Sequence, residues 1–201
     1  KLGSHGVRTI LDYAVEGEKT ESGFEATCTE ILNTFSEAIS TPHVPFCVFK
    51  VTGIGDAVLL EKVQSGSVLE ESEHAAFSRV KARVDRICSR AGETSVPVLI
   101  DAEETWIQDP VDVLTILMME KFNRARAVVY NTYQLYRHDR LSFLHDSLEA
   151  ARQRDFILGA KLVRGAYMEK ERQRAQDMGY ASPIQKDKEH TDNDYNEAIH
   201  F

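Results

Sequence analysis

Short apolar runs alternate with segments of helical apolar spacing along most of this chain. Runs rich in β-branched and aromatic residues predict five strands. Between them, apolar residues recur every three or four positions, which is the spacing of one buried helix face. Strands that alternate with helices are typical of a parallel sheet whose strands are joined by crossover helices. The predicted strands are residues 9–15, 46–52, 96–102, 127–134 and 157–163.

The predicted helices follow from this spacing and from residues that favour helix ends. Ser67 and Ser72 are candidate N-caps within a polar helical region. Asp109 followed by Pro110 predicts a helix start, with aspartate as the N-cap and proline in the first turn. Asp139 is expected to cap the next helix. The helical segments are residues 24–39, 56–93, 111–122, the segment after 139, 168–178, and 193 to the last residue.

The second to fifth predicted strands are apolar where they begin and polar where they end. Functional residues at the carboxyl ends of parallel strands are typical of a (β/α) barrel. An open doubly wound sheet also binds ligands there, but it usually carries GxGxxG after its first strand, and this motif is absent. We therefore predict an α/β fold, a (β/α)8 TIM-like barrel that is partial or truncated, with about five βα units. Because a closed barrel needs eight strands and typically ~250 residues, residues 1–201 are expected to form a single barrel domain whose C-terminal units are absent from this sequence.

Charged and amide side chains gather at these predicted strand ends. A carboxylate beside lysines stays ionised and holds them in place, and a cation aimed at a ligand stabilises negative charge as it develops. Gly165 and Ala166 follow the fifth strand and leave bare backbone against a ligand. The polar candidates are Lys50, Asp101, Asn131, Gln134, Lys161 and Arg164.

Composition argues against several classes of function. A net charge of -8 argues against a nucleic-acid partner. Cys28, Cys47 and Cys88 show no CxxC spacing, so they predict neither a disulfide framework nor a zinc site, and they favour a reducing compartment. The histidines are scattered, and no metal site is expected. No apolar run is long enough to span a bilayer and no signal peptide is visible, so secretion is not expected.

Three motifs in a fixed order give the strand-end residues a specific context. They are Asp101-Ala-Glu-Glu104, Asn131-Thr-Tyr-Gln134 and Lys161-Leu-Val-Arg-Gly-Ala-Tyr167. Their order and spacing resemble those of the proline dehydrogenase (proline oxidase) family, from about Thr9 to the last residues. The resemblance implies a (β/α)8 barrel with non-covalent FAD at the carboxyl ends of the strands. It also implies oxidation of L-proline to Δ1-pyrroline-5-carboxylate, the first step of proline catabolism, with hydride transfer to flavin N5.

The resemblance implies roles by motif position. Asp101 and Lys161 are the expected catalytic residues, and Lys50 and Tyr167 are the expected substrate-binding residues. Asn131 stands where many members of the family have glutamine. Lys161 stands where many bacterial members have arginine, so the positive charge is kept and the planar fork is lost. The expected cofactor-binding residues are Ala102, Asn131, Gln134, Lys161, Val163, Arg164, Gly165 and Ala166.

The resemblance also carries expectations about partners and location. The family usually passes electrons to a membrane quinone, so we expect peripheral contact with a membrane. That membrane would be the bacterial inner membrane at its cytoplasmic face, or the mitochondrial membrane at its matrix side. The arginine pair that binds the substrate carboxylate lies in a part of the family's barrel beyond this sequence. The segment by itself is therefore expected to bind flavin poorly and to lack turnover.

A second class of function stays open at this point. The chain could be a non-catalytic relative, or a barrel of another chemistry such as an aldolase-like lyase that forms a Schiff base. Lys50 or Lys161 could serve as the nucleophile of that reaction.

Overall fold

The computed structural model describes residues 3–13 and 18–201 of the chain. Its strands pair in parallel, and each lies beside the strand that precedes it in the sequence. Consecutive strands have this arrangement in a (β/α) barrel, so the predicted fold class is confirmed. The strands are β1 (Leu11–Asp12), β2 (Cys47–Lys50), β3 (Val98–Asp101), β4 (Val129–Gln134) and β5 (Ala160–Val163).

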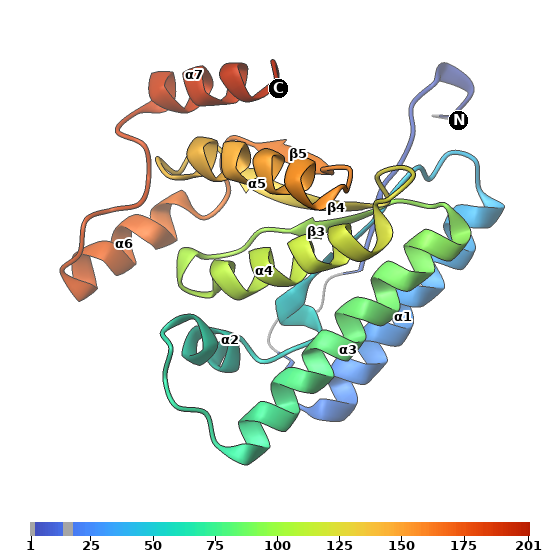
Figure 1. The fold of residues 1–201 in the computed structure, drawn as a ribbon, viewed down its shortest axis with the longest axis horizontal. Helices are drawn as coiled ribbons and strands as arrows, with labels where there is room; N and C mark the ends of the chain where they lie inside the picture. Colours follow the sequence, from blue (N-terminus) through green and yellow to red (C-terminus); the bar gives the residue numbers. More distant parts are fainter. Residues whose placement is uncertain (1–2, 14–17) are drawn as a thin grey trace.

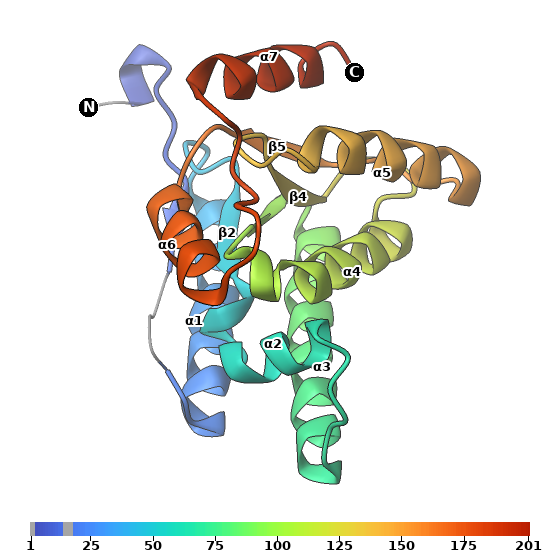
Figure 2. The same ribbon diagram turned by 90° about the vertical axis from the view of Figure 1, so that its left-hand side faces the viewer.

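Helices cover one face of this sheet. In Figure 2, α1, α3, α4, α5 and α7 follow one another around that face, whereas α6 lies beyond the carboxyl ends of the strands (Figure 1). None of the described helices combines the length and the apolar character needed to cross a bilayer. The helices are α1 (Glu21–Ser40), α2 (Ala57–Gln64), α3 (Glu71–Thr94), α4 (Thr105–Phe122), α5 (Arg140–Arg154), α6 (Met168–Met178) and α7 (Lys188–Ala198), with 3-10 turns η1 (Gly3–His5) and η2 (Val51–Gly53).

The main core lies between the sheet and this helix layer. Successive side chains of a strand point to opposite faces, and those that point to the helices, such as Phe49, Ile100 and Val129, are fully buried. The opposite face of the same strands ends in polar residues, which form the candidate site described below. The helix residues of this core include Ile31, Phe35, Val84, Ile87, Val111 and Leu114.

The structure corrects the predicted start of α3. This helix begins after Glu70, and it has a capping box in which Glu70 and Glu73 each accept a hydrogen bond from the other's backbone N–H. Ser67, one predicted N-cap, lies in the loop before α3. Ser72, the other predicted N-cap, lies inside the first turn of the helix. A glutamate pair thus provides the N-terminal cap that we had assigned to serine.

Other boundaries also differ from the prediction. The predicted strand at 9–15 pairs with β2 only at Leu11 and Asp12, and its residues 14 and 15 lie outside the described part of the chain. α7 begins at Lys188 and not at 193. Asp139 does occupy the N-cap position of α5, but its carboxylate pairs with Arg137 at 2.7 Å and makes no capping bond.

Pro110 lies inside α4 and not at its start. In a regular helix the Asp109 N–H would donate to the Thr105 carbonyl, but the Gln64 side chain lies between these groups. Its Oε1 accepts from Asp109 N at 3.0 Å, and its Nε2 donates to Thr105 O at 2.6 Å. The Gln64 amide thus satisfies a backbone N–H and a backbone carbonyl in the turn before Pro110. Proline itself has no N–H to donate to the helix.

The Asn123 side chain fixes the start of β4 and the loop before β5. It is fully buried. Its Oδ1 accepts from the N–H groups of Val128 and Val129, each at 2.9 Å. Its Nδ2 donates to the carbonyls of Val129 and Ile157 at 2.8 and 2.9 Å. One amide therefore holds together two segments that lead into neighbouring strands.

Replacing Asn123 with alanine should lower the free energy of unfolding by about 2–4 kcal/mol, because buried backbone groups lose their partners. Urea unfolding followed by circular dichroism measures this loss. Asn33→Ala is the matched control, because Asn33 is exposed on α1, and it should change the value by less than about 0.5 kcal/mol. Equal stabilities of the two variants would contradict the role given to Asn123.

Candidate functional site

Four polar side chains form one row across the carboxyl ends of β2 to β5. Lys50 pairs in register with Asp101, and Thr132 pairs with Lys161. Ile100 pairs with Asn131, which places Asp101 beside Thr132. The register of the sheet therefore aligns a cation, a carboxylate, a hydroxyl and a second cation on the face opposite the helices.

A cavity of about 170 Å³ opens at this row. It brings together all the predicted site residues except Asn131 and Arg164. Thr132 and Tyr136 also line it, and sequence reasoning missed both. Thr132 stands two positions before Gln134, so the alternation of strand faces was a signal that could have found it. The lining residues are Lys50, Asp101, Ala102, Thr132, Gln134, Tyr136, Lys161, Val163, Gly165, Ala166 and Tyr167.

Asp101 and Lys161 both line the cavity and form a salt bridge with each other. Their side chains are 20% and 30% exposed, so the pair is neither fully screened by water nor sealed from a ligand. The carboxylate of β3 holds the ammonium group of β5 at the cavity. The chain thus presents a fixed positive charge to whatever occupies the cavity.

Gln134 lines the cavity, and its side-chain amide is hydrogen-bonded to neighbouring residues. Its Nε2 donates to the Glu103 carbonyl at 2.7 Å and to the Tyr136 hydroxyl at 2.8 Å. Its Oε1 accepts from Arg137 at 3.2 Å. Burial raises the pKa of Tyr136 to about 12, so its hydroxyl stays protonated at neutral pH. These bonds fix the orientation of the amide.

Arg164 lies next to the cavity but not in it. Its guanidinium pairs with Asp192 of α7 at 3.1 Å and lies over the ring of Tyr195 at 4.8 Å. The side chain is about half exposed. These contacts tie the end of β5 to α7, so the structure gives Arg164 a partner that spacing could not predict.

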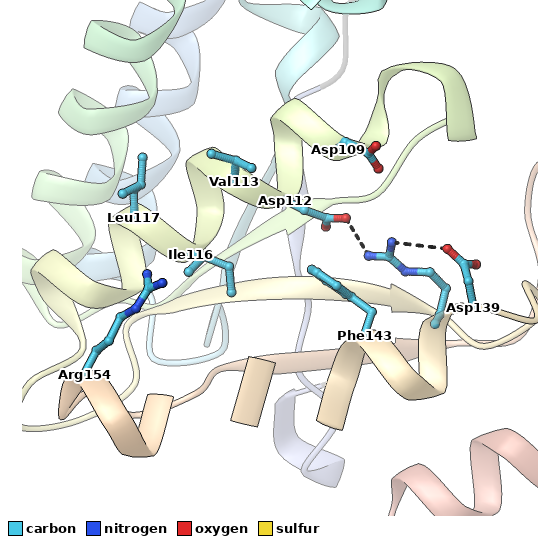
Figure 3. A pocket seen from close by; sticks show the side chains of 9 residues that line it. Asp109, Asp112, Val113, Ile116, Leu117, Asp139, Phe143 and Arg154 are labelled. Atoms are coloured by element: carbon cyan, nitrogen blue, oxygen red, sulfur yellow. Dashed lines mark hydrogen bonds and ion pairs between the residues drawn. The ribbon is translucent and has the colours of Figure 1, made fainter. Parts of the chain in front are cut away.

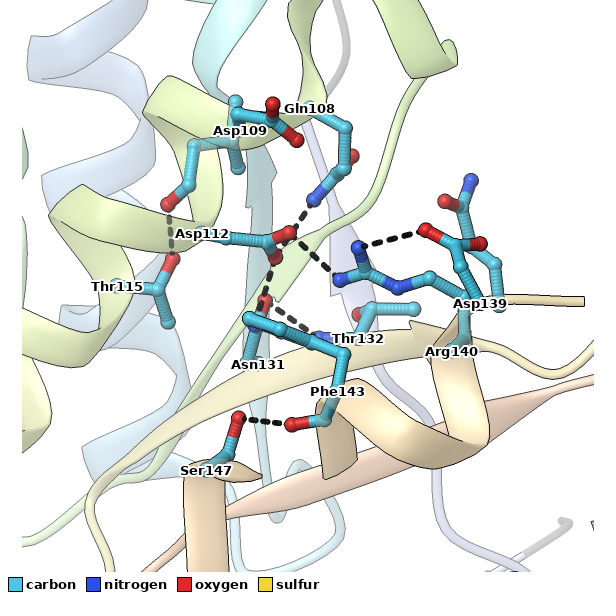
Figure 4. A network of polar contacts seen from close by, with 12 residues as sticks. Gln108, Asp109, Asp112, Thr115, Asn131, Thr132, Asp139, Arg140, Phe143 and Ser147 are labelled. Atoms are coloured by element: carbon cyan, nitrogen blue, oxygen red, sulfur yellow. Dashed lines mark hydrogen bonds and ion pairs between the residues drawn. The ribbon is translucent and has the colours of Figure 1, made fainter. Parts of the chain in front are cut away.

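Asn131 lies on the opposite face of β4 from Gln134. Its Nδ2 donates to Asp112 of α4 at 2.8 Å, and its Oδ1 accepts from the Thr132 N–H at 2.9 Å (Figure 4). Residues three positions apart in a strand point to opposite faces, so Asn131 and Gln134 cannot both face one cavity. The Asn131 side chain therefore faces the helix layer, and it does not line the cavity in which its contact with flavin was predicted.

Asp112 is the centre of this outer polar cluster. It accepts from Gln108 at 2.9 Å and pairs with Arg140 of α5 at 2.6 Å. Both members of the ion pair are at most 5% exposed. The guanidinium of Arg140 also stacks over the ring of Phe143 at 4.0 Å. Each buried charge has a partner, as a stable interior requires.

A larger cavity, of about 520 Å³, lies beside this cluster between α4 and α5 (Figure 3). Its apolar wall includes Val113, Ile116 and Leu117. Its buried charges, Asp112 and Arg140, are paired with each other. The cavity lies on the helix side of the sheet, away from the strand-end row, so we interpret its polar groups as structural.

The fold and the polar row define an α/β protein of the (β/α)-barrel class, whose functional edge is the carboxyl end of the strands. The model of the family described as proline dehydrogenase matches residues 1–201, and the chain belongs to this family. The resemblance found in the sequence is therefore confirmed.

Two curated relatives illustrate the relationship. The chain is 35% identical over 200 residues to the carbapenem antibiotics biosynthesis protein CarD of Pectobacterium carotovorum subsp. carotovorum, covering 100% of this chain and 52% of that protein. It is 37% identical over 200 residues to the mitochondrial proline dehydrogenase 1 of Caenorhabditis elegans, covering 99% of this chain and 32% of that protein. The chain thus spans about half or less of these relatives.

Solved structures show the same fold. Proline utilization A (PutA) from Bdellovibrio bacteriovorus inactivated by N-propargylglycine matches with a TM-score of 0.82 at 16% identity, over 98% of this chain and 22% of that chain. The D779Y mutant of PutA from Bradyrhizobium japonicum matches with a TM-score of 0.76 at 20% identity, over 94% and 20%. At such identities the likeness is evidence for the fold alone.

Removing Asp112 tests the structural reading of the outer cluster. Asp112→Ala leaves Arg140 without its buried partner, with only the half-exposed Asp139 at 3.9 Å, and should cost about 3–5 kcal/mol of unfolding free energy. Asp85→Ala is the control, because Asp85 pairs with Lys121 on the surface, where both side chains are more than a third exposed, and the expected cost is at most about 1 kcal/mol. Guanidinium unfolding measures both. A loss at Asp112 no larger than at Asp85 would overturn the interpretation.

Proposed function

We propose that the protein oxidises L-proline to Δ1-pyrroline-5-carboxylate with FAD as the electron acceptor. The observation that carries this proposal is the row of Lys50, Asp101, Thr132 and Lys161, which opens on one cavity in a member of the proline dehydrogenase family. In this reaction the ring carbon next to nitrogen loses a hydride and the nitrogen loses a proton. A C–N single bond thereby becomes C=N.

The residues around the cavity fit a flavin. Ala102, Gly165 and Ala166 give it a wall of small side chains and backbone, against which a flat ring can lie. Lys161 supplies a cation held by Asp101. FAD, when bound, accepts the hydride from proline and gains negative charge, which a nearby cation favours. We assign Val163, Arg164 and Gln134 to the same cofactor site, with Arg164 at its edge.

Lys50 and Tyr167 are the proposed substrate-facing residues. Both line the cavity. Burial raises the pKa of Tyr167, while the Lys50 ammonium opposes this shift, so the phenol keeps its proton at neutral pH and can donate a hydrogen bond. The Schiff-base alternative needs an uncharged amine on Lys50 or Lys161, whereas Lys161 is salt-bridged to Asp101 and Lys50 interacts with the Tyr167 hydroxyl. We therefore favour the flavin reaction.

Substitution of Lys161 tests this function in the whole purified protein, because residues 1–201 by themselves are expected to lack turnover. Lys161→Met removes the fixed cation and should lower kcat/KM for proline by roughly 100-fold in a dye-coupled assay. Lys161→Arg keeps the charge and should retain most of the rate. The control is Lys186→Met, because Lys186 is exposed and outside the cavity.

The spectrum of the unsubstituted protein decides between the two classes of function. Flavin absorbance that proline bleaches without oxygen supports the proposal. A colourless protein that borohydride traps covalently with a carbonyl substrate on Lys161 would refute it, as would a Lys161→Met variant with full activity.

The electron acceptor and the location are further parts of the proposal. We infer a membrane quinone as acceptor and peripheral contact with the membrane, at the cytoplasmic face of a bacterial inner membrane or the mitochondrial matrix side. The Caenorhabditis elegans relative is named as mitochondrial, which supports the second location. The flavin-loaded protein should pellet with liposomes, and it should reduce a soluble quinone. No pelleting in either redox state would contradict the membrane contact.

A further inference from the structure

Glu103 is a buried carboxylate directly behind the candidate site. It lies two residues after Asp101 and is 4% exposed. Its Oε1 accepts from the Thr52 N–H at 3.1 Å, and its Oε2 accepts from the Thr52 hydroxyl. Thr52 belongs to η2, which follows β2 directly. The carboxylate therefore bridges the ends of β2 and β3.

The main chain of Glu103 makes two more contacts with side chains. Its N–H donates to the Gln108 Oε1 at 2.6 Å, and its carbonyl accepts from the Gln134 Nε2 at 2.7 Å. Gln134 lines the cavity and comes from β4. One residue thus connects the carboxyl ends of three neighbouring strands, although its own side chain does not line the cavity.

The charge of Glu103 also reaches the cavity. Burial raises the pKa of Glu103 itself, and the hydrogen bonds from Thr52 oppose this shift. Burial raises the pKa of Tyr167; Lys50 opposes this, whereas the carboxylates of Glu103 and Glu104 add to it. Lys50 of β2 and the two glutamates of the loop after β3 act on the phenol. Asp101 of β3 and Lys161 of β5 line the same cavity, and Lys170 of α6 pairs with Glu104.

We propose that Glu103 is a positioning residue of this site, whose Thr52-anchored carboxylate and main chain hold Lys50, Tyr167 and Gln134 in their working arrangement. The role rests on the proposed function, since it concerns the same cavity. Through its charge, Glu103 keeps the Tyr167 hydroxyl protonated, and so able to donate, up to a higher pH. Through its carbonyl, it fixes the amide of Gln134.

Glu103→Gln removes the charge and keeps the size and one of the two acceptor oxygens that face Thr52. The midpoint of Tyr167 deprotonation should fall by about 0.5–1 pH unit, because a nearby negative charge disfavours phenolate. The absorbance of tyrosinate measures this midpoint. The signal of the other tyrosines is removed by subtracting the titration of the same protein with Tyr167→Phe added. The alkaline limb of kcat/KM for proline should move in the same direction. Glu93→Gln, on an exposed part of α3, should move neither.

Variants of Thr52 are a second test of the role of Glu103, and they remain informative if Glu103→Gln does not fold. Thr52→Val removes the hydroxyl donor and should lower kcat/KM about 10-fold, whereas Thr52→Ser keeps the donor and should stay within about twofold. An unshifted Tyr167 titration in folded Glu103→Gln, or equal losses in the two Thr52 variants, would overturn the proposal. Absence of proline turnover in the whole unsubstituted protein refutes the proposed function instead, and the titration still decides the role of Glu103.

Discussion

Parallel pairing in register is the constraint on which the candidate site depends. Because β2 pairs with β3 and β4 with β5 residue by residue, Lys50 lies beside Asp101 and Thr132 beside Lys161. A shift of one residue in any of these strands would turn its polar side chain towards the helices. The same shift would expose apolar residues such as Phe49, which is fully buried on the helix side. The hydrophobic core therefore sets the row of charges on the other face.

The polar cluster behind β4 connects this core to the site. Asp112 accepts from Asn131 and Gln108 and pairs with Arg140, and Gln108 in turn accepts from the Glu103 N–H. A buried ion pair adds little net stability, because removing both charges from water costs about as much as their attraction returns. Its directional bonds do restrict where α4 and α5 lie over the strand. We interpret the cluster as a means of fixing geometry, which extends from the helix layer to the residue behind the cavity.

What could be predicted from the sequence is the part that depends on local periodicity. Apolar strands with polar ends predicted the row, and Lys50, Asp101 and Lys161 do lie together. Asn131 was assigned to the cavity because it belongs to a recognisable motif, but strand alternation places it on the other face from Gln134. The first turn of α4 depends on hydrogen bonds from Gln64, and Arg164 pairs with Asp192. Both contacts join elements that are far apart in the chain, so no local sequence pattern predicts them.

α6 shows how a polar helix is held over the strand ends without a hydrophobic core of its own. Its Glu171 is 1% exposed and accepts from the Thr105 N–H at 2.6 Å and hydroxyl at 2.7 Å. It thereby caps α4, a role that the side chain of Glu104 at the N-cap position does not fill. Trp106 lies under the guanidinium of Arg174 at 4.2 Å. Because α6 follows the cavity wall directly, these contacts also determine where that wall lies. α7, which contacts α5 and β5, takes the place of a barrel helix, and α6 is an added support of the site.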